Sequence, residues 1–352
     1  MRRLLPVLNS ALRRLGRDVD PRRSASDVTI LAPAEEQEVT PPAFLPGQLD
    51  KVMAVHPARF SRSSVLERAT QRSVTHAPVI RYTFHDCVVH PAGFDVWSGS
   101  YRNRPMSSVA YPRDGIGRLP KANYCMSTNS LKWFGDWLMD SCTAAHLATA
   151  DEALFMDIRR DWPHASQYAQ AFGLEPEPIE GKMFRVARLC MHQDHGMGSM
   201  KRARLREMRQ TLASRFAPGA RTFPSRPVYL RRGLAGVSRP IVNEAELIEG
   251  LTRRGFDVFD LEGADLKDIQ ERFRTTELVV SLEGSHLNHL YFAMKPGASI
   301  LALIPSDRFI VVQLGFARSV GMRFGFVVVD PVTGGYRVNL PDVLKTVDLL
   351  QR

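Results

Sequence analysis

The sequence predicts an α/β protein whose C-terminal half is a parallel, doubly wound sheet. From residue 228 onward, short apolar runs alternate with segments whose apolar residues recur at helical spacing. The apolar run 278–280 is followed at once by small and polar residues, and then by a helix-compatible segment, 287–294. Strands that alternate with helices in this way are typical of a parallel, doubly wound sheet.

The elements of this half follow from strand-length apolar runs, glycine stops and capping residues. Asn243 precedes a helix that has Glu246 at its third position, as in a capping box, and Gly255 ends it. The expected strands are 228–230, 256–261, 278–280, 299–304 and 325–329, and the expected helices are 243–254, 266–275, 287–294, 308–320 and 341–350.

The first half reads as short strands and turns, followed by helices. Strands are expected at 51–55, 79–84 and 87–90, and helices at 133–150 and 200–216. The second of these helices is strongly basic. The expected division has four parts: a basic segment and connector (1–50), an N-terminal domain (51–216), a Pro/Arg-rich linker (217–227) and a C-terminal domain (228–352). The last helix either stays with the C-terminal domain or packs back on the N-terminal domain.

Composition sets the class of protein and of partner. The 352 residues are 44% hydrophobic and 24% charged, as in ordinary globular chains, and carry a net charge of +10. That charge favours an anionic partner: nucleic acid, a membrane surface or a phosphorylated substrate. The four cysteines form no CxxC pair, which fits reduced thiols in the cytoplasm and argues against a zinc site.

Residues 1–17 form a short basic stretch with leucines at helical spacing. A helix of this kind either lies on an anionic membrane surface or packs on its own domain. The first alternative predicts a protein peripheral to the inner face of the plasma membrane; the second, which the short length favours slightly, predicts no membrane contact.

The turn after 278–280 contains Glu283, Gly284, Ser285 and His286. A glycine there allows close approach of a ligand to the backbone, and the free N–H groups of a helix start favour an anion such as phosphate. A plain strand-to-helix turn without a ligand is the alternative, and this stretch alone does not separate the two.

Two places in the first half could supply acid–base chemistry. Asp136 and Asp140 lie four residues apart among aromatic residues, and a carboxylate held against apolar rings can serve as a base. His192, Asp194 and His195 cluster beside glycines, in a spacing that is weak for a metal and equally suited to a loop lining a pocket. Solvated carboxylates and a plain loop are the ordinary alternatives.

Four short motifs follow one another in the C-terminal half: Tyr229-Leu230-Arg231-Arg232, Arg239-Pro240-Ile241-Val242-Asn243-Glu244, Gly255-Phe256 and Glu283-Gly284-Ser285-His286-Leu287-Asn288. In their order and spacing, residues 227–305 resemble glycosyltransferase family 61. An upstream family motif, Asn-x-x-His-Trp-Leu-x-Asp/Glu, is similar to 133–140, although Asp136 stands here at the histidine position.

The resemblance implies a GT-B fold, in which two Rossmann-like doubly wound domains face each other across a cleft. It implies an inverting, metal-independent sugar transfer from a nucleotide-sugar, with no cofactor and no metal site, to a hydroxyl of a glycan or lipid-linked acceptor. Bacterial surface-polysaccharide synthesis is the setting that it suggests.

Roles follow from that chemistry. Arg231, Arg232 and the helix start after Gly284 would stabilise charge that grows on the leaving diphosphate. Glu244 would hold a ribose hydroxyl or simply favour its helix start, and Glu283 and His286 would contact the sugar or base. The base is expected from the N-terminal domain, with Asp136 first and His192 and His195 as rivals. The expected donor-site residues are Arg231, Arg232, Arg239, Asn243, Glu244, Glu283, Gly284, Ser285, His286 and Asn288.

Two other functions remain open at this stage. The charge and the basic helix would suit a non-enzymatic protein that binds nucleic acid or an anionic surface, although no nucleic-acid module is recognisable. An aspartate stands where the family motif has histidine. This difference favours the alternative that the protein is a family member that has lost catalysis.

Overall fold

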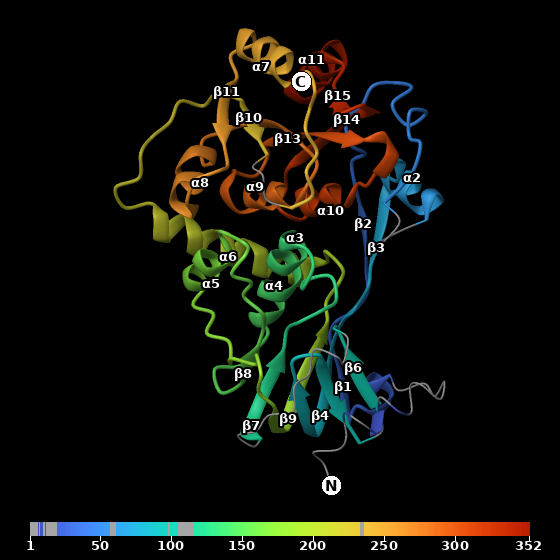
Figure 1. The fold of residues 1–352 in the computed structure, drawn as a ribbon, viewed down its shortest axis with the longest axis vertical. Coiled ribbons are helices and arrows are strands. Elements are labelled where there is room, and N and C mark those ends of the chain that lie inside the picture. The colour runs from blue at the N-terminus through green and yellow to red at the C-terminus, as the bar shows by residue number, and fades with distance from the viewer. Residues whose placement is uncertain are drawn as a thin grey trace. The chain divides into compact units, whose positions relative to one another are not determined.

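A computed structural model describes residues 6, 8, 9, 11, 20–56, 61–97, 99–104, 116–232 and 236–352 (Figure 1). The chain divides into two compact units, each discontinuous in sequence. The first unit consists of Met1–Glu35 and His76–Arg204, and the second of Glu36–Thr75 and Leu205–Arg352. The chain passes between the units through β2 (Glu35–Glu38), β3 (Ser73–His76) and the long helix α6 (Ser199–Phe216).

These limits differ from the expected domain boundaries at 50 and 217–227. Residues near 43 and 55 join the second unit because Ala43 bridges to Gly325 and Val55 bridges to Phe309. The Phe44 ring stacks on Phe326 with 4.7 Å between ring centroids. The expected strand at 51–55 is therefore a single bridge in an irregular segment, held by contacts from residues far away in sequence.

The first unit is built on a seven-stranded sheet of order β6-β5-β4-β9-β7-β8, with β1 also paired to β4. Its strands are β1 (Asp27–Ala32), β4 (Val79–His90), β5 (Gly93–Val96), β6 (Gly99–Arg102), β7 (Gly117–Tyr124), β8 (Ala153–Phe155) and β9 (Phe184–Gln193). The expected strands 79–84 and 87–90 are one strand, which Asp86 kinks with a φ of 57°.

This sheet is mixed, so a doubly wound parallel sheet is the wrong expectation for the first unit. Strand β4 is antiparallel to β1, β5 and β9, and only β7 runs parallel to its neighbours β8 and β9. The physical reason lies in the tight turn between β4 and β5, because so short a connection joins only antiparallel strands. The remaining elements are η2 (Pro21–Ser24), α3 (Phe134–Asp136), the π-helical turn η4 (Trp137–Ser141), α4 (Cys142–Ala145) and α5 (Ala165–Ala171).

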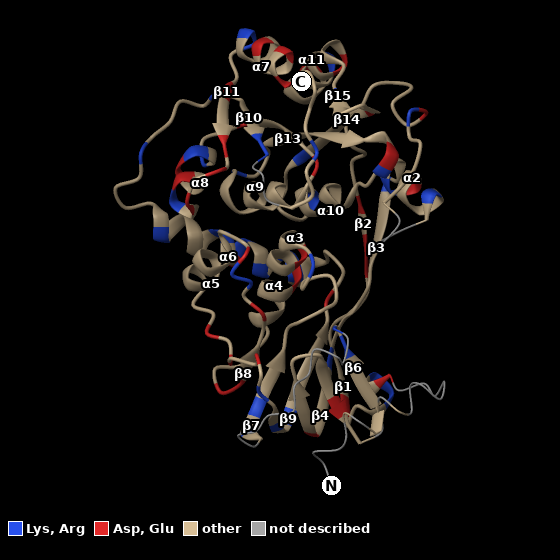
Figure 2. Ribbon diagram, in the orientation of Figure 1, with Lys and Arg blue, Asp and Glu red and all other residues tan. Residues whose placement is uncertain are grey.

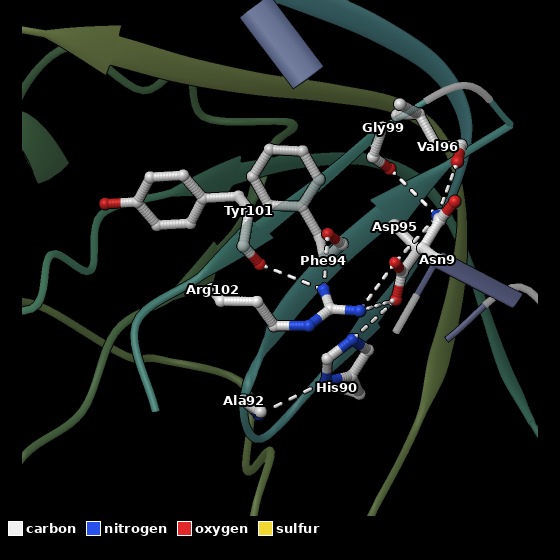
Figure 3. Close-up of polar contacts among 9 residues, drawn as sticks. All are labelled: Asn9, His90, Ala92, Phe94, Asp95, Val96, Gly99, Tyr101 and Arg102. Carbon is white, nitrogen blue, oxygen red and sulfur yellow. Dashed lines mark hydrogen bonds and ion pairs between the residues drawn. The ribbon is translucent and has the colours of Figure 1, made fainter. Parts of the chain in front are cut away.

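A buried polar network centres on Asp95 in β5 of this unit (Figure 3). The Asp95 carboxylate accepts hydrogen bonds from His90 Nε2 at 2.8 Å, from Arg102 Nη2 at 2.7 Å and from Asn9 Nδ2 at 2.8 Å. The Asn9 amide also donates to the Val96 carbonyl at 3.1 Å. Within the expected basic segment 1–17, Asn9 is thus anchored to the first unit, whereas residues 1–5, 7, 10 and 12–17 lie outside the described residues.

We expect Asp95→Ala to lower the free energy of unfolding by about 3–5 kcal/mol, because it leaves the buried Arg102 guanidinium without its charge partner. Burial raises the pKa of Asp95, but the His90 hydrogen bond and the Arg102 charge outweigh it and hold the pKa below its ordinary value. The stabilisation is therefore present at neutral pH and is lost as the pH falls through the lowered pKa.

Urea unfolding at neutral pH measures this effect, and Asp161→Ala is its control. Asp161 pairs with Arg159 in the same unit, but its side chain is 61% exposed, so its loss should cost only about 0–1 kcal/mol. Equal unfolding midpoints for the two variants would contradict the role assigned to Asp95.

The second unit has a six-stranded sheet of order β11-β10-β12-β13-β14-β15, parallel except for β15. This confirms a parallel sheet in the C-terminal half. Its strands are β10 (Val228–Arg231), β11 (Asp257–Asp260), β12 (Leu278–Leu282), β13 (Ser299–Pro305), β14 (Arg323–Val332) and β15 (Gly335–Arg337). The runs Leu278–Leu282 and Ser299–Pro305 are buried throughout because helices cover both faces of the sheet.

Figure 1 shows α7 and α11 on one face of this sheet and α8, α9 and α10 on the other. The last helix, α11, packs on β13, β14 and α7, so it belongs to the second unit. The helices are α2 (Arg62–Thr70), α7 (Glu244–Arg253), α8 (Leu266–Phe273), α9 (Asn288–Ala293), α10 (Val312–Ser319) and α11 (Leu340–Gln351). None of the described helices is long and apolar enough to cross a membrane.

Charges of both signs lie side by side on the helices of the second unit (Figure 2). On α7, for example, Arg253 pairs with Glu249 at 2.7 Å. The basic helix expected at 200–216 is present as α6, but its Lys201 is fully buried and its Arg204 is 6% exposed. Burial of these two side chains and pairing of others with carboxylates reduce the free positive charge of these helices, which weakens the case for a basic nucleic-acid-binding face.

Candidate functional site

Three loops meet at the carboxyl ends of neighbouring strands in the second unit. Arg232 follows β10, Glu283 and Gly284 follow β12, and Arg308 lies in the short turn after β13. Strands β10, β12 and β13 are adjacent and parallel, so their carboxyl ends lie at one edge of the sheet. This edge is where open α/β sheets bind ligands.

A buried ion pair lies at the centre of this edge. Arg239 Nη1 donates to Glu283 Oε2 at 2.9 Å, and each of the two side chains is only 7% exposed. Breaking such a pair leaves an uncompensated buried charge, so each partner fixes the position of the other.

Two further arginines surround this pair, and both have donors without a partner. Burial, together with the nearby Arg239, lowers the pKa of Arg232 to about 10 and lowers the pKa of Arg308. Arg232 Nη1 and Arg308 Nε are buried and donate to no atom among the described residues. We call Arg232, Arg239 and Arg308, gathered around Glu283, the arginine cluster.

The arginine cluster has more positive than negative charge and holds unused N–H donors. Guanidinium groups bind the oxygens of phosphate in planar, two-point contacts. An anion with several oxygens, such as a diphosphate, would satisfy the unpartnered donors and offset the repulsion among the arginines.

Gly284 and His286 border the cluster. A Cβ atom on Gly284 would lie 2.8 Å from His286 Nδ1 and 3.4 Å from Arg239 Nη2, so only glycine fits there. Ser281 Oγ donates to the Leu230 carbonyl at 2.7 Å, and it therefore accepts from His286 Nε2 at 2.9 Å. Burial and the charges of Arg232 and Arg239 hold the pKa of His286 well below its ordinary value, so the ring is neutral.

That hydrogen bond leaves His286 Nδ1 as an acceptor beside Gly284 and Arg239. The helix expected at 287–294 starts later and is shorter, because Ser285–Leu287 forms a 3-10 turn before α9. Asn288 Nδ2 donates to the Ser285 carbonyl at 2.9 Å and holds this turn together.

The other expected donor-site residues are engaged in local contacts. Arg231 donates to Asp260 Oδ2 at 3.0 Å and lies 3.4 Å from Glu244 Oε2, while Glu244 Oε1 accepts from the Tyr229 hydroxyl at 2.9 Å. Of the two consecutive arginines, Arg232 thus belongs to the cluster and Arg231 is tied to neighbouring carboxylates.

Asn243 does not cap helix α7 as the sequence pattern predicts. Its amide oxygen accepts from the Val338 N–H at 3.0 Å, and its amide nitrogen donates to the Val338 carbonyl at 2.9 Å. The side chain therefore joins the start of α7 to the segment after β15, and its oxygen is no longer available to the first turn of the helix.

The first unit contains a separate cavity of about 80 Å³. Its polar lining comes from the π-helical turn η4 and from the end of β9, and its apolar wall includes Tyr101, Tyr124 and Met191. Asp140, His192, Asp194 and His195 all line this cavity, which we call the first-unit cavity. Isolated π-helical turns are frequent at functional sites because they change the direction of side chains within a helix.

The carboxylate of Asp140 is held by Lys201, whose ammonium group is fully buried. Lys201 Nζ donates to Asp140 Oδ1 at 2.8 Å and to the Asp194 carbonyl at 2.9 Å. Arg204 in turn donates to Asp194 Oδ2 at 2.6 Å. The Asp140 side chain remains 23% exposed, so the lysine orients a carboxylate that solvent or a ligand reaches.

The other expected bases differ from Asp140 in access and in hydrogen bonding. Asp136 is only 8% exposed and is not among the residues that line the first-unit cavity. His192 Nε2 accepts from Arg81 Nε at 3.1 Å, and burial together with Arg81 lowers its pKa to about 4. The lone pair of His192 is thus engaged, whereas His195 is exposed at the rim.

The structure therefore gathers only part of the expected residues into two places, each within one unit, and leaves Arg231, Asn243, Glu244 and Asp136 outside them. Sequence reasoning missed Arg308, whose isolated position in a Ser-Asp-Arg turn gives no motif signal. It also ranked Asp136 above Asp140, because spacing alone does not show which of the two reaches a cavity. Among the described residues, no three His, Cys, Asp or Glu side chains are grouped as a metal ion requires.

A comparison with protein families gives a match to the family described as Glycosyltransferase 61 over residues 113–301. The match includes Asp140, Arg232, Arg239 and Glu283 and ends before Arg308. No curated protein matches the chain. Because the matched segment spans more than half of the sequence, the chain belongs to glycosyltransferase family 61 and is a glycosyltransferase.

Proposed function

We propose that this glycosyltransferase moves a sugar from a nucleotide-sugar to an acceptor hydroxyl with inversion at the anomeric carbon. The arginine cluster is the observation that carries the proposal. It combines three guanidinium groups, unused donors and a glycine-lined approach at the ligand-binding edge of a parallel sheet.

The leaving group is a nucleoside diphosphate, and negative charge grows on its β-phosphate as the glycosidic bond breaks. Arg232 and Arg308 donate to the phosphate oxygens, and the Arg239–Glu283 pair fixes the third guanidinium at the same edge. Fixed donors that act where charge develops lower the barrier without reorganisation. The cluster thereby takes the role that a divalent cation has in metal-dependent transferases.

The acceptor hydroxyl must lose its proton to a base. We assign this role to Asp140, which reaches the first-unit cavity while Lys201 fixes its direction. His195, exposed at the rim of the same cavity, would contact the acceptor, and His192 would offer its unpartnered Nδ1–H to an acceptor oxygen.

In this proposal the second unit binds the donor and the first unit binds the acceptor. Glycans or lipid-linked sugars of a bacterial surface polysaccharide are the proposed acceptors. This assignment of donor and acceptor binding can be tested directly. Variants in the second unit should change donor affinity, and variants in the first unit should change the turnover rate alone.

A thermal-shift screen with nucleoside diphosphates and sugar nucleotides tests the donor site, because a ligand bound only by the native state raises the melting temperature. Product formation from the stabilising sugar nucleotide, followed by NMR of the new anomeric proton, tests transfer and inversion. A nucleotide that stabilises the protein without any turnover would indicate a family member that has lost catalysis.

We expect turnover to survive EDTA within about twofold, since arginines occupy the place of the cation. The measurement is the steady-state rate before and after dialysis against chelator. A rate that disappears with EDTA and returns with Mg²⁺ or Mn²⁺ would contradict the proposed role of the cluster.

A further inference from the structure

The second unit contains a cavity that lies away from the arginine cluster. It measures about 310 Å³ and is enclosed by the last turns of α6, by α8 and by the residues that follow α9. The arginine cluster borders the Ser285 side of α9, whereas this cavity borders the Met294 side. We call it the α6–α8 cavity.

Positive charge dominates its lining. Arg206 and Arg274 line it without an ion pair or hydrogen bond to any described residue. Arg209 donates to the carbonyls of Tyr291 and Met294, and burial lowers the pKa of Arg209 to about 10, so it is still charged at neutral pH.

The remaining charges around the cavity cancel in pairs. Glu271 is engaged by Arg221 at 2.6 Å, and Lys295 is engaged by Glu277 at 2.7 Å. Glu277 is not among the lining residues, and the Glu271 carboxylate lies between Arg221 and Lys267, although its buried Oε1 accepts no hydrogen bond from a described residue.

A buried amide gives an independent sign of a missing partner. Gln270 of α8 is 6% exposed and lines the cavity, and its Nε2 donates to no described atom. A buried donor without an acceptor is costly and is rare in folded proteins. An oxygen-rich ligand would satisfy this amide and the arginines together.

The rest of the wall is apolar and includes Phe216, Phe292 and Pro296. Its volume is at the lower end of the range of small-molecule pockets. We propose that the α6–α8 cavity binds a phosphate group carried by a small or amphiphilic molecule, at a site separate from the arginine cluster and independent of the proposed reaction.

Isothermal calorimetry measures the affinity for inorganic pyrophosphate and tests the proposal. The protein carries Arg232→Ala and Arg308→Ala, so that two arginines of the arginine cluster no longer contribute to binding. Arg206→Ala with Arg274→Ala should weaken the remaining binding by about tenfold or more for each arginine. Arg253→Ala is the matched control, because Arg253 lies on α7 in an exposed ion pair. Unchanged affinity after loss of Arg206 and Arg274, or no residual binding in this background, would overturn the proposal.

Gln270→Met separates a ligand site from a packing defect. Because the substitution removes an unpartnered buried donor, we expect a higher melting temperature and a lower pyrophosphate affinity. A higher melting temperature with unchanged affinity would refute the role of the amide in binding.

Sedimentation with vesicles distinguishes the two sources of phosphate. Vesicles that contain phosphatidic acid should bind through Arg206 and Arg274, and phosphatidylcholine vesicles should not, if the natural ligand is a lipid headgroup. If the protein binds pyrophosphate but neither kind of vesicle, the result would support a soluble phosphorylated ligand. If it binds neither pyrophosphate nor vesicles, the result would refute the proposal.

Discussion

Replacing both Arg232 and Arg308 by alanine should weaken nucleoside-diphosphate binding by about 10²- to 10⁴-fold, the largest effect that we expect on the donor side. Arg232 Nη1 and Arg308 Nε are buried and have no partner among the described residues, so each arginine would lose charge-assisted hydrogen bonds to phosphate when it is removed. Isothermal calorimetry with the diphosphate that stabilises the protein most measures the effect.

Arg231→Ala is the matched control, because it removes the neighbouring arginine from the same strand end. Both terminal nitrogens of Arg231 are already engaged by Asp260 and Glu244 and only its Nε lacks a partner among the described residues, so its loss should change affinity much less. A strong loss with Arg231→Ala, combined with wild-type affinity in the Arg232→Ala, Arg308→Ala variant, would show that the phosphate binds on the other side of β10. Melting temperatures of the free variants establish that each one is folded.

Asp140→Asn should lower single-turnover rates by about 10²-fold or more under saturating donor, the usual scale for the loss of a general base. The amide keeps the size of the side chain and can still accept from Lys201 through its oxygen, but it cannot accept the proton of the hydroxyl. Donor affinity should stay at the wild-type value, because Asp140 belongs to the first unit and the arginine cluster to the second.

Asp136→Asn makes the same chemical change one turn earlier in the helix. Asp136 is buried and does not line the first-unit cavity, so this variant should turn over almost normally if it folds. The reverse result, with Asp136→Asn damaged and Asp140→Asn active, would restore the base to the position where the family motif has histidine. Damage by His195→Ala alone would assign the base to the exposed histidine instead.

The sequence by itself determined the parallel sheet of the C-terminal half, including the strand around 278–280 and the turn that follows it. Uninterrupted apolar runs at 278–280 and 299–304 require burial on both faces, which only a parallel sheet covered by helices provides. The close approach of a ligand at Gly284 stays a prediction, and the structure adds that a side chain there would meet His286. The motifs spaced along residues 227–305 also indicated the family that the comparison shows.

The first unit could not be predicted in the same way. No local pattern identifies the distant partner of a strand, and the pairing of β4 with β9 joins residues far apart in sequence. The limits of the units depended on distant contacts as well, since the segment around Ala43 is fixed by β14.

Only the tertiary structure decided which charged groups act together. Arg231 and Arg232 are neighbours in sequence, but successive side chains at a strand end point to opposite sides, so one meets Asp260 and the other meets the cluster. Arg308 joins that cluster because β13 lies beside β12, a fact of strand order that no local pattern contains. Asp140 reaches a cavity and Asp136 does not, because burial depends on what packs against a helix as well as on its spacing.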